Sequence, residues 1–171
     1  MREVQLSGYR SIALLSIFTI VACCHLRKGN TVLNHQESQA AIAELREAYA
    51  AFNRGDIDTA VRFLDPQIEW TEPTEFPGGG TYHGVDGARQ YLTQSRASVV
   101  QVISTPEQFI PAGDRIVVFV HARVLPRESN TWQDIRLADV YTVQNGRATK
   151  MRAFANREEA LRWVGIGNNP Q

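Results

Sequence analysis

The sequence is poor in cysteine, histidine, net charge and long apolar runs, and each shortage excludes a class of protein. The two cysteines, Cys23 and Cys24, lie near the N-terminus, so we expect neither a disulfide nor thiol chemistry in the folded domain. The 18 basic and 18 acidic residues balance, which implies no basic surface for nucleic acid. The four histidines lack the spacing of metal ligands. We therefore predict a protein without a metal, a cofactor or a nucleic-acid partner.

The longest apolar run covers residues 11–22. It is shorter than the roughly 20 residues that span a bilayer, but it is typical of a signal peptide. The run ends in Ala22 and Cys23, which resembles the bacterial lipoprotein cleavage box, where the cysteine thiol receives the lipid. Residues 1–25 are thus expected to be a signal peptide, a lipoprotein signal lipidated at Cys23, or a membrane anchor. Each places the protein in the bacterial cell envelope, exported or anchored, with membrane contact only through this segment.

The remaining chain divides into a tether, one domain and a tail. Residues 26–37 are polar without apolar periodicity, which favours a flexible tether. A hydrophobic fraction of 43% over 171 residues is enough for one core, which we assign to residues 38–165. Residues 166–171 are expected to form a frayed tail.

Helical periodicity dominates the first part of this domain. Ile42, Leu45, Tyr49 and Phe52 share one helical face, and this helix is predicted to end at Gly55. Two further helices are expected, a short one after residue 56 and a third over residues 85–95. A fourth short helix is predicted over residues 157–164.

Alternating patterns dominate the second part. A short strand is predicted over residues 68–72, and long strands over residues 99–110, 116–125, 132–143 and 148–155, with turns between them. Helices followed by a meander indicate an α+β fold. We predict a cone-shaped, curved antiparallel sheet with the three N-terminal helices on its concave face, enclosing an apolar pocket.

Asp139 is the most informative residue of the sequence. Ile135, Leu137, Tyr141 and Val143 have the same parity along the strand, so the Asp139 carboxyl is expected among apolar side chains. Burial there favours the neutral acid, which donates a hydrogen bond or exchanges a proton with a bound substrate. The alternative is a structural aspartate paired with a neighbouring cation; the candidate cations are Arg136, Arg152 and His121.

Glu72 is the second candidate, because it has the parity of Ile68 and Trp70 and precedes a proline. Two carboxyls facing one cavity form a plausible acid and base pair; the alternative is an exposed glutamate at a strand end. Further residues are expected to bind substrate or, alternatively, to serve as helix cap or core: Trp70, His83, Tyr91, His121 and Tyr141.

Several stretches of the domain resemble the SnoaL-like and ketosteroid isomerase-like branch of the nuclear transport factor 2 superfamily. They are residues 47–66, 68–73, 80–84, 138–147 and 153–154. The resemblance covers nearly the whole domain. It implies the cone-shaped fold and homodimerisation, but members of this superfamily differ in function.

Carried over by position, the resemblance implies that Glu72 is the catalytic base and Asp139 the protonated acid of an oxyanion hole. The oxyanion tyrosine of the isomerases falls at Ala48, and Tyr49 is turned roughly 100° away around the helix. Epoxide hydrolases of this fold have an arginine two residues before the aspartate, whereas Arg136 is three residues before it. Neither chemistry is fully reproduced.

Two hypotheses follow for function. The first is a cofactor-free isomerase, cyclase or dehydratase that transfers a proton on a small apolar carbonyl compound. The second is an exported, membrane-tethered, non-catalytic domain that binds an apolar ligand or dimerises. The first requires Glu72 and Asp139 in one pocket, while the second requires only the pocket.

Overall fold

The computed structural model describes residues 32–167. The predicted signal segment, the lipidation at Cys23 and the first half of the predicted tether lie outside these residues. Within them the elements follow one another as α1 (His35–Arg54), α2 (Ile57–Ala60), β1 (Leu64–Glu72), β2 (Gly80–His83), α3 (Gly84–Ala97), β3 (Val99–Ala112), β4 (Arg115–Pro126), β5 (Gln133–Gln144), β6 (Arg147–Phe154) and α4 (Arg157–Trp163).

Helix α1 begins earlier than the sequence pattern suggests. The Asn34 side chain accepts a hydrogen bond from the Glu37 backbone N–H, and the Glu37 side chain accepts one from the Asn34 N–H. This capping box satisfies two backbone donors and starts the helix at His35, inside the segment expected to be a tether. Leu33 also donates a backbone hydrogen bond of 2.9 Å to Gly113. The folded domain therefore starts several residues before residue 38.

The junction between α1 and α2 is as predicted. Helix α1 ends at Gly55, whose φ of 84° lies in the left-handed region that favours glycine. The Asp56 side chain then accepts a hydrogen bond from the Thr59 backbone N–H and caps α2. This turn fixes the direction of α1 against the sheet.

The sheet has six strands in the order β2-β1-β6-β5-β4-β3. Neighbouring strands are antiparallel with one exception, since β1 and β6 are parallel. The sheet is thus mixed, which corrects the expectation of an entirely antiparallel one. Strand β6 lies between β1 and β5, so two strands far apart in sequence become neighbours. Strand β2, which pairs with β1 from Gly80 to His83, is not among the strands that the sequence pattern predicts.

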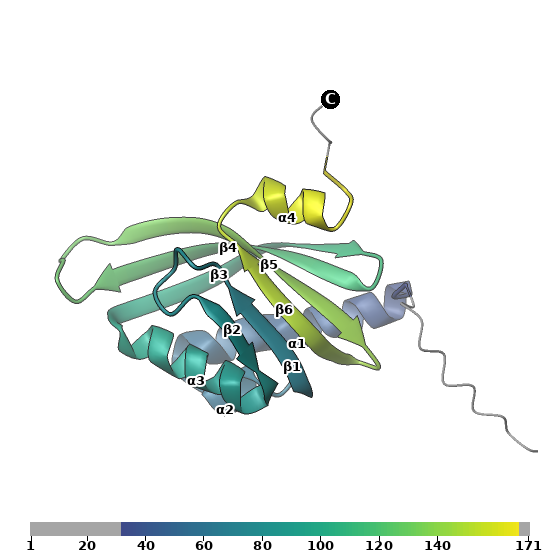
Figure 1. The fold of residues 1–171 in the computed structure, drawn as a ribbon, viewed down its shortest axis with the longest axis horizontal. Helices are drawn as coiled ribbons and strands as arrows, with labels where there is room; N and C mark the ends of the chain where they lie inside the picture. The colour runs from purple at the N-terminus through teal and green to yellow at the C-terminus, as the bar shows by residue number, and fades with distance from the viewer. Residues whose placement is uncertain (1–31, 168–171) are drawn as a thin grey trace, which may run out of the picture.

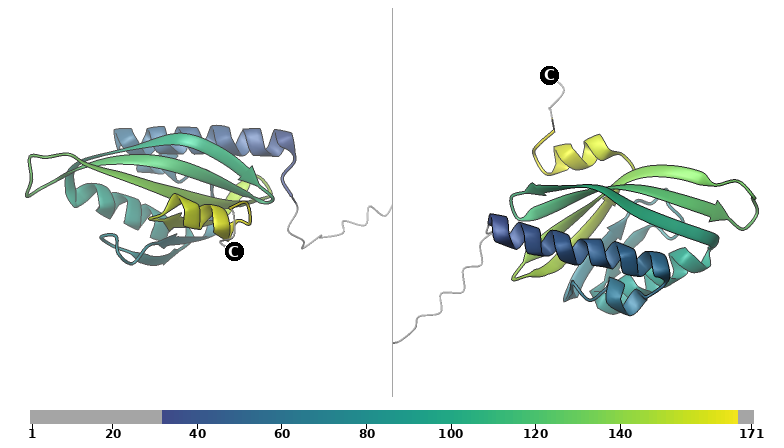
Figure 2. Two further views of the ribbon diagram at one scale, coloured as in Figure 1. Left: turned by 90° about the horizontal axis from the view of Figure 1, so that it is seen from above. Right: turned by 180° about the vertical axis from the view of Figure 1, so that it is seen from behind.

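Figures 1 and 2 show the layers of the α+β fold, with α1, α2 and α3 on one side of the curved sheet and α4 on the other. The larger apolar core lies between the sheet and the three N-terminal helices. A smaller core lies under α4, where Ala160 packs with Val117, Ala138, Val140 and Phe154. The helices on the concave side leave room for the cavity described below.

The curvature has a local cause in the strand pairing. The register of β3 with β4 shifts between Pro106 and Gln108, and that of β1 with β6 shifts between Leu64 and Glu69. Such irregularities bend a strand and increase its twist. Over residues 32–167, no helix combines the length and apolar character needed to cross a membrane.

Candidate active site

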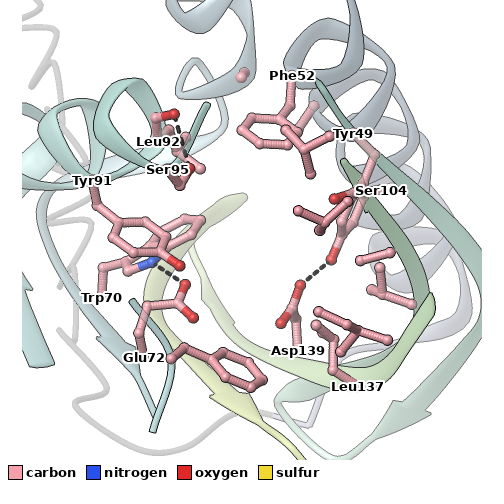
Figure 3. Close-up of a pocket in the computed structure, with 18 of the residues that line it drawn as sticks. Tyr49, Phe52, Trp70, Glu72, Tyr91, Leu92, Ser95, Ser104, Leu137 and Asp139 are labelled. Carbon is pink, nitrogen blue, oxygen red and sulfur yellow. Dashed lines mark hydrogen bonds between the residues drawn. The ribbon is translucent and has the colours of Figure 1, made fainter. Parts of the chain in front are cut away.

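A cavity of about 570 Å³ lies between the concave face of the sheet and helices α1 and α3. Its wall contains side chains of β1, β4 and β5, together with Phe76 and Pro77 from the loop between β1 and β2. Most lining residues are apolar. Glu72 and Asp139 are the two carboxyl groups in the wall, and Figure 3 shows both pointing into the same space.

Strand alternation brings these carboxyls to the cavity. On β5, Leu137, Asp139 and Tyr141 line it, while Ala138 and Val140 pack on the opposite face under α4. On β1, Trp70 and Glu72 are on the cavity side and are each 7% exposed. A carboxyl from each of two strands therefore faces one largely apolar space.

Asp139 is held by a tyrosine of α1. The Tyr49 hydroxyl donates a hydrogen bond to Asp139 Oδ2 over 2.5 Å (Figure 3). The Tyr141 hydroxyl lies 3.5 Å from that of Tyr49. Burial, with the nearby Asp139 charge as a further cause, raises the pKa of both tyrosines well above the usual value. Both hydroxyls therefore stay protonated, and the Tyr49 hydroxyl stabilises the ionised form of Asp139.

Glu72 is held by its neighbour two residues earlier on the same strand. The Trp70 indole N–H donates a hydrogen bond of 2.8 Å to Glu72 Oε1 (Figure 3). Tyr91, on α3, packs beside Trp70 with ring centroids 6.2 Å apart, and its hydroxyl also lowers the pKa of Glu72 by hydrogen bonding. Among residues 32–167, no cation is a cause of the shift in the pKa of this carboxyl.

Both carboxyls have raised pKa values, to different extents. Burial, and secondly repulsion by Asp139, raise the pKa of Glu72 from 4.5 to about 8. Burial raises the pKa of Asp139 from 3.8 to about 6, against the lowering effect of the Tyr49 hydrogen bond. At neutral pH Glu72 is therefore mainly protonated and Asp139 mainly ionised. The pair offers one acid and one base in the same cavity.

Two of the expected substrate-binding residues lie elsewhere. His121 does have the parity of Val117 and Phe119, but this row lies on the outer face of the sheet. There His121 Nε2 is 2.6 Å from Asp134 Oδ1, so the histidine is paired at the surface. This corrects the expectation of a pocket residue, because parity groups residues on a face without saying which face is inside.

His83 is also outside the cavity wall. It occupies the residue before α3 with an extended backbone, but its side chain makes no capping hydrogen bond. The side chain is exposed, since strand β2 lies at the edge of the sheet. By contrast, Trp70, Tyr91 and Tyr141 all line the cavity.

Tyr49 is the site residue that sequence reasoning misses. Its position one residue after Ala48 suggests a side chain turned away from the site. In the structure Tyr49 and Ala48 both line the cavity, and Tyr49 reaches Asp139. A tyrosine is long enough to compensate for such a rotation. The signal that could have found it was its place on the apolar face with Leu45 and Phe52.

The cations near β5 are on its outer face. Arg136 Nη1 donates to Glu107 Oε1 over 3.0 Å, and Arg157 Nη2 donates to Glu107 Oε2 over 2.8 Å. Neither arginine lines the cavity. Arg136 is therefore not available to the site, as its parity relative to Asp139 predicts.

Comparison with known protein families identifies a family model that matches this chain. The SnoaL-like domain family matches residues 45–151, a stretch that runs from α1 into β6 and contains Tyr49, Glu72 and Asp139. Comparison with the curated proteins gave no significant match.

Solved structures with the same fold are numerous. An NTF2-like protein of unknown function from Burkholderia pseudomallei is 27% identical, with 74% of this chain and 98% of that chain covered and a TM-score of 0.63. TerC, co-crystallised with polyporic acid, is 25% identical, with 73% and 98% covered and a TM-score of 0.62. An LEH-like epoxide hydrolase of M. tuberculosis is 16% identical, with 68% and 83% covered and a TM-score of 0.56, which shows the fold alone.

Proposed function

Since this chain belongs to the SnoaL-like domain family, we propose that it is a cofactor-free enzyme that transfers a proton on a small apolar carbonyl compound. Isomerases, cyclases and dehydratases share this elementary step. The observation that supports the proposal is the pair of carboxyls, the buried Glu72 and the partly buried Asp139, which face one cavity and have separated pKa values. Pairs of titratable groups with separated pKa values are typical of acid and base catalysis.

The pKa order favours Asp139 as the base and Glu72 as the acid. The ionised Asp139 would take a proton from the carbon next to the carbonyl, and the C–H electron pair would form the new C=C bond. The C=O π electron pair would move onto the carbonyl oxygen, and the neutral Glu72 would donate its proton to that oxygen, giving an enol. This assignment is the reverse of the one that the family resemblance implied. It follows from burial and mutual repulsion, which raise the pKa of Glu72 above that of Asp139.

The apolar wall supports a small apolar substrate. Beyond the carboxyls, the cavity is bordered mainly by aliphatic and aromatic side chains, including Leu45, Phe52, Val120 and Leu137. A cavity of about 570 Å³ is within the range of roughly 300–1,000 Å³ that holds small ligands. A ligand that excludes water from the cavity would strengthen the electrostatic effect of both carboxyls.

A non-catalytic binding domain would use the same cavity. For an apolar ligand alone, however, two carboxyls in the cavity wall without a cationic partner there are a disadvantage, because removal from water disfavours the charged form. Apolar residues at positions 72 and 139 would bind such a ligand without that cost. The carboxyls therefore favour the enzyme over the binding domain.

Solvent isotope exchange tests the proposal without knowledge of the full reaction. The full chain is incubated in D2O with 1-indanone, 2-tetralone and 3-methylcyclohex-2-enone, and loss of the proton next to the carbonyl is followed by NMR. We expect exchange faster than in buffer for at least one ketone. Asp139→Asn should lower the enzymatic rate by about 100-fold or more, because it removes the base.

Asp134→Asn is the matched control for this experiment. It makes the same chemical change on the same strand, but Asp134 lies on the outer face beside His121. This variant should keep the wild-type exchange rate. Ketones that bind in the cavity, as seen by shifts of the tyrosine resonances, without any exchange above buffer would contradict the proposal and favour the binding domain.

Two further properties are proposed from the sequence and the resemblance alone. The protein would act in the cell envelope, exported or anchored through residues 1–25, and it would form a homodimer. The N-terminal residues that carry the first proposal lie outside the described residues.

A further inference from the structure

The cavity wall contains acidic side chains but no side chain that carries a positive charge. Its ionisable lining residues are Glu72 and Asp139 and the tyrosines 49, 91 and 141, and no lysine, arginine or histidine is among the described residues that line it. Every ionisable group in the wall is therefore neutral or negative. With Asp139 ionised, the cavity holds a negative charge that no protein cation in its wall compensates.

The groups around each carboxyl come from four elements. Asp139 faces Tyr49 of α1 and Tyr141 of β5, and it lies within electrostatic range of Glu72. Glu72 faces Trp70 of its own strand and Tyr91 of α3. Each of the tyrosines has a raised pKa through burial and the neighbouring acids, so none supplies a positive charge.

Arg152 shares a second hollow with Glu72, on the other side of the cavity wall. Glu72 also borders a second hollow of about 230 Å³, which contains Arg152 together with Glu75 and Glu159. The Arg152 guanidinium stacks over the rings of Phe154 and Trp163, at 5.3 Å and 5.9 Å from their centroids. Arg152 is therefore engaged on the outer face and does not border the main cavity.

Aromatic rings gather at the carboxyl end of the cavity. The centroid of Trp70 is 6.2 Å from that of Tyr91 and 6.4 Å from that of Tyr141, and Figure 3 shows Tyr91, Trp70 and Glu72 along one wall. The faces of such rings attract cations, most strongly at tryptophan. Glu72 itself is almost fully buried and points into this space.

We propose that the carboxyl end of the cavity binds the protonated amine of an apolar amine, between Glu72 and Asp139 and against the aromatic rings of Trp70, Tyr91 and Tyr141. The apolar part of the ligand would occupy the aliphatic remainder of the cavity. Carboxylate ligands are excluded, because they add a third acid to a site without a cation. The proposal concerns binding and does not depend on the proposed chemistry.

Three ligands with one ring system and different head groups test this charge preference. Isothermal titration calorimetry of the full chain compares 2-naphthylmethylamine, 2-naphthalenemethanol and 2-naphthoate at neutral pH. We expect the amine to bind on the order of tenfold or more tighter than the alcohol, because a desolvated cation gains from both the carboxylate and the rings. The naphthoate should bind more weakly than the alcohol.

Substitutions show which carboxyl groups cause the preference for the amine. At neutral pH, Asp139→Asn should reduce the preference for the amine over the alcohol, because it removes the ionised carboxylate, whereas Glu69→Gln should leave it unchanged. Glu72→Gln should remove the part of the preference that develops as the pH rises to about 8, where Glu72 ionises. Glu69 is on β1 as well, but it is outside the cavity wall and its carboxyl lies 3.5 Å from Lys150 Nζ. The amine preference should also grow from about pH 5 to about pH 8, as Asp139 and then Glu72 ionise, because the arylmethylamine, although less basic than a lysine side chain, stays mainly protonated over this range.

An amine that binds no tighter than the alcohol, or a naphthoate that binds as tightly as the amine, would overturn the proposal. So would an amine preference that survives in both carboxyl variants. These outcomes are separate from those of the isotope exchange, because exchange of neutral ketones does not require amine binding and amine binding does not require exchange.

Discussion

Charged residues have opposite environments on the two faces of strand β5. On the outer face, Asp134 is paired with His121, and Arg136 is paired with Glu107, all near solvent. On the cavity face, Asp139 is the same residue type as Asp134, yet its neighbours are tyrosine hydroxyls and another acid. Charge is thus compensated on the outer face and left uncompensated on the cavity face.

The comparison indicates that the functional residues of this domain lie on the cavity face of the sheet. Surface ion pairs contribute little to stability and are readily exchanged. Buried acids without cations are costly, so their presence needs a reason beyond the fold. The catalytic and amine-binding proposals both rest on this contrast between the two faces.

The largest expected effect concerns stability against pH. Because the pKa of Glu72 is raised from its ordinary 4.5 to about 8 in the folded protein, its contribution is fully present below about pH 4.5 and is lost as the pH rises to about 8. The loss is on the order of 5 kcal/mol in the free energy of unfolding. Urea denaturation at several pH values between these limits measures it.

Glu72→Gln should remove most of this decline and be more stable than the wild type at about pH 9. The smaller decline in stability that remains is due to Asp139 and occurs between pH 3.8 and about pH 6, from its ordinary pKa to its pKa in the folded protein. Glu69→Gln is the matched control and should follow the wild type. If the stability of the wild type increased over the same pH range, the negative charge of Glu72 would have to be compensated in the folded protein.

Tyr49→Phe should have an intermediate effect. It removes the hydrogen bond to Asp139, which costs about 1–2 kcal/mol of stability at neutral pH, where Asp139 is ionised. It should also raise the pKa of Asp139 further above about 6, because that bond favours the ionised form. A shift of the isotope-exchange pH profile to higher pH checks this.

Tyr82→Phe is the control for this substitution. The Tyr82 hydroxyl donates to the Gly78 carbonyl over 2.6 Å, outside the cavity wall. Loss of that bond should leave the pH profile unchanged. An identical profile in Tyr49→Phe would mean that the tyrosine supports the fold without influencing Asp139.

The smallest effect is expected on the outer face. Glu107→Gln removes the pairing with Arg136 and Arg157. Its effect on stability should be small and should decrease as salt is added, because exposed ion pairs are screened. Thermal unfolding at low and high salt measures it, and the cavity properties should not change. A large, salt-independent loss would mean that the outer face depends on its charges as much as the cavity does.

The sequence predicts the features that depend on local periodicity. Strand parity places Asp139 with Leu137 and Tyr141, and Glu72 with Trp70, and these residues do line one cavity. The helix boundary at Gly55 and the helix over residues 157–164 are likewise visible in local patterns. Such features depend on neighbours within a few residues.

Features that depend on distant contacts are missed. The parallel pairing of β1 with β6 joins segments about eighty residues apart, and no local pattern specifies it. The same limitation affects His121, whose row lies on the outer face. The order of the two carboxyl pKa values is also missed, because desolvation and mutual repulsion depend on the assembled cavity.

The most direct test is a pH titration of the two carboxyl groups. Carbon-13 NMR of the side-chain carboxyls in the full chain, assigned with Glu72→Gln and Asp139→Asn, reports both pKa values. We predict that Glu72 titrates with a pKa of about 8 and Asp139 with a pKa of about 6. Values at or below the ordinary 4.5 and 3.8 for both groups would mean that their charges are compensated, and would contradict the proposed acid and base pair.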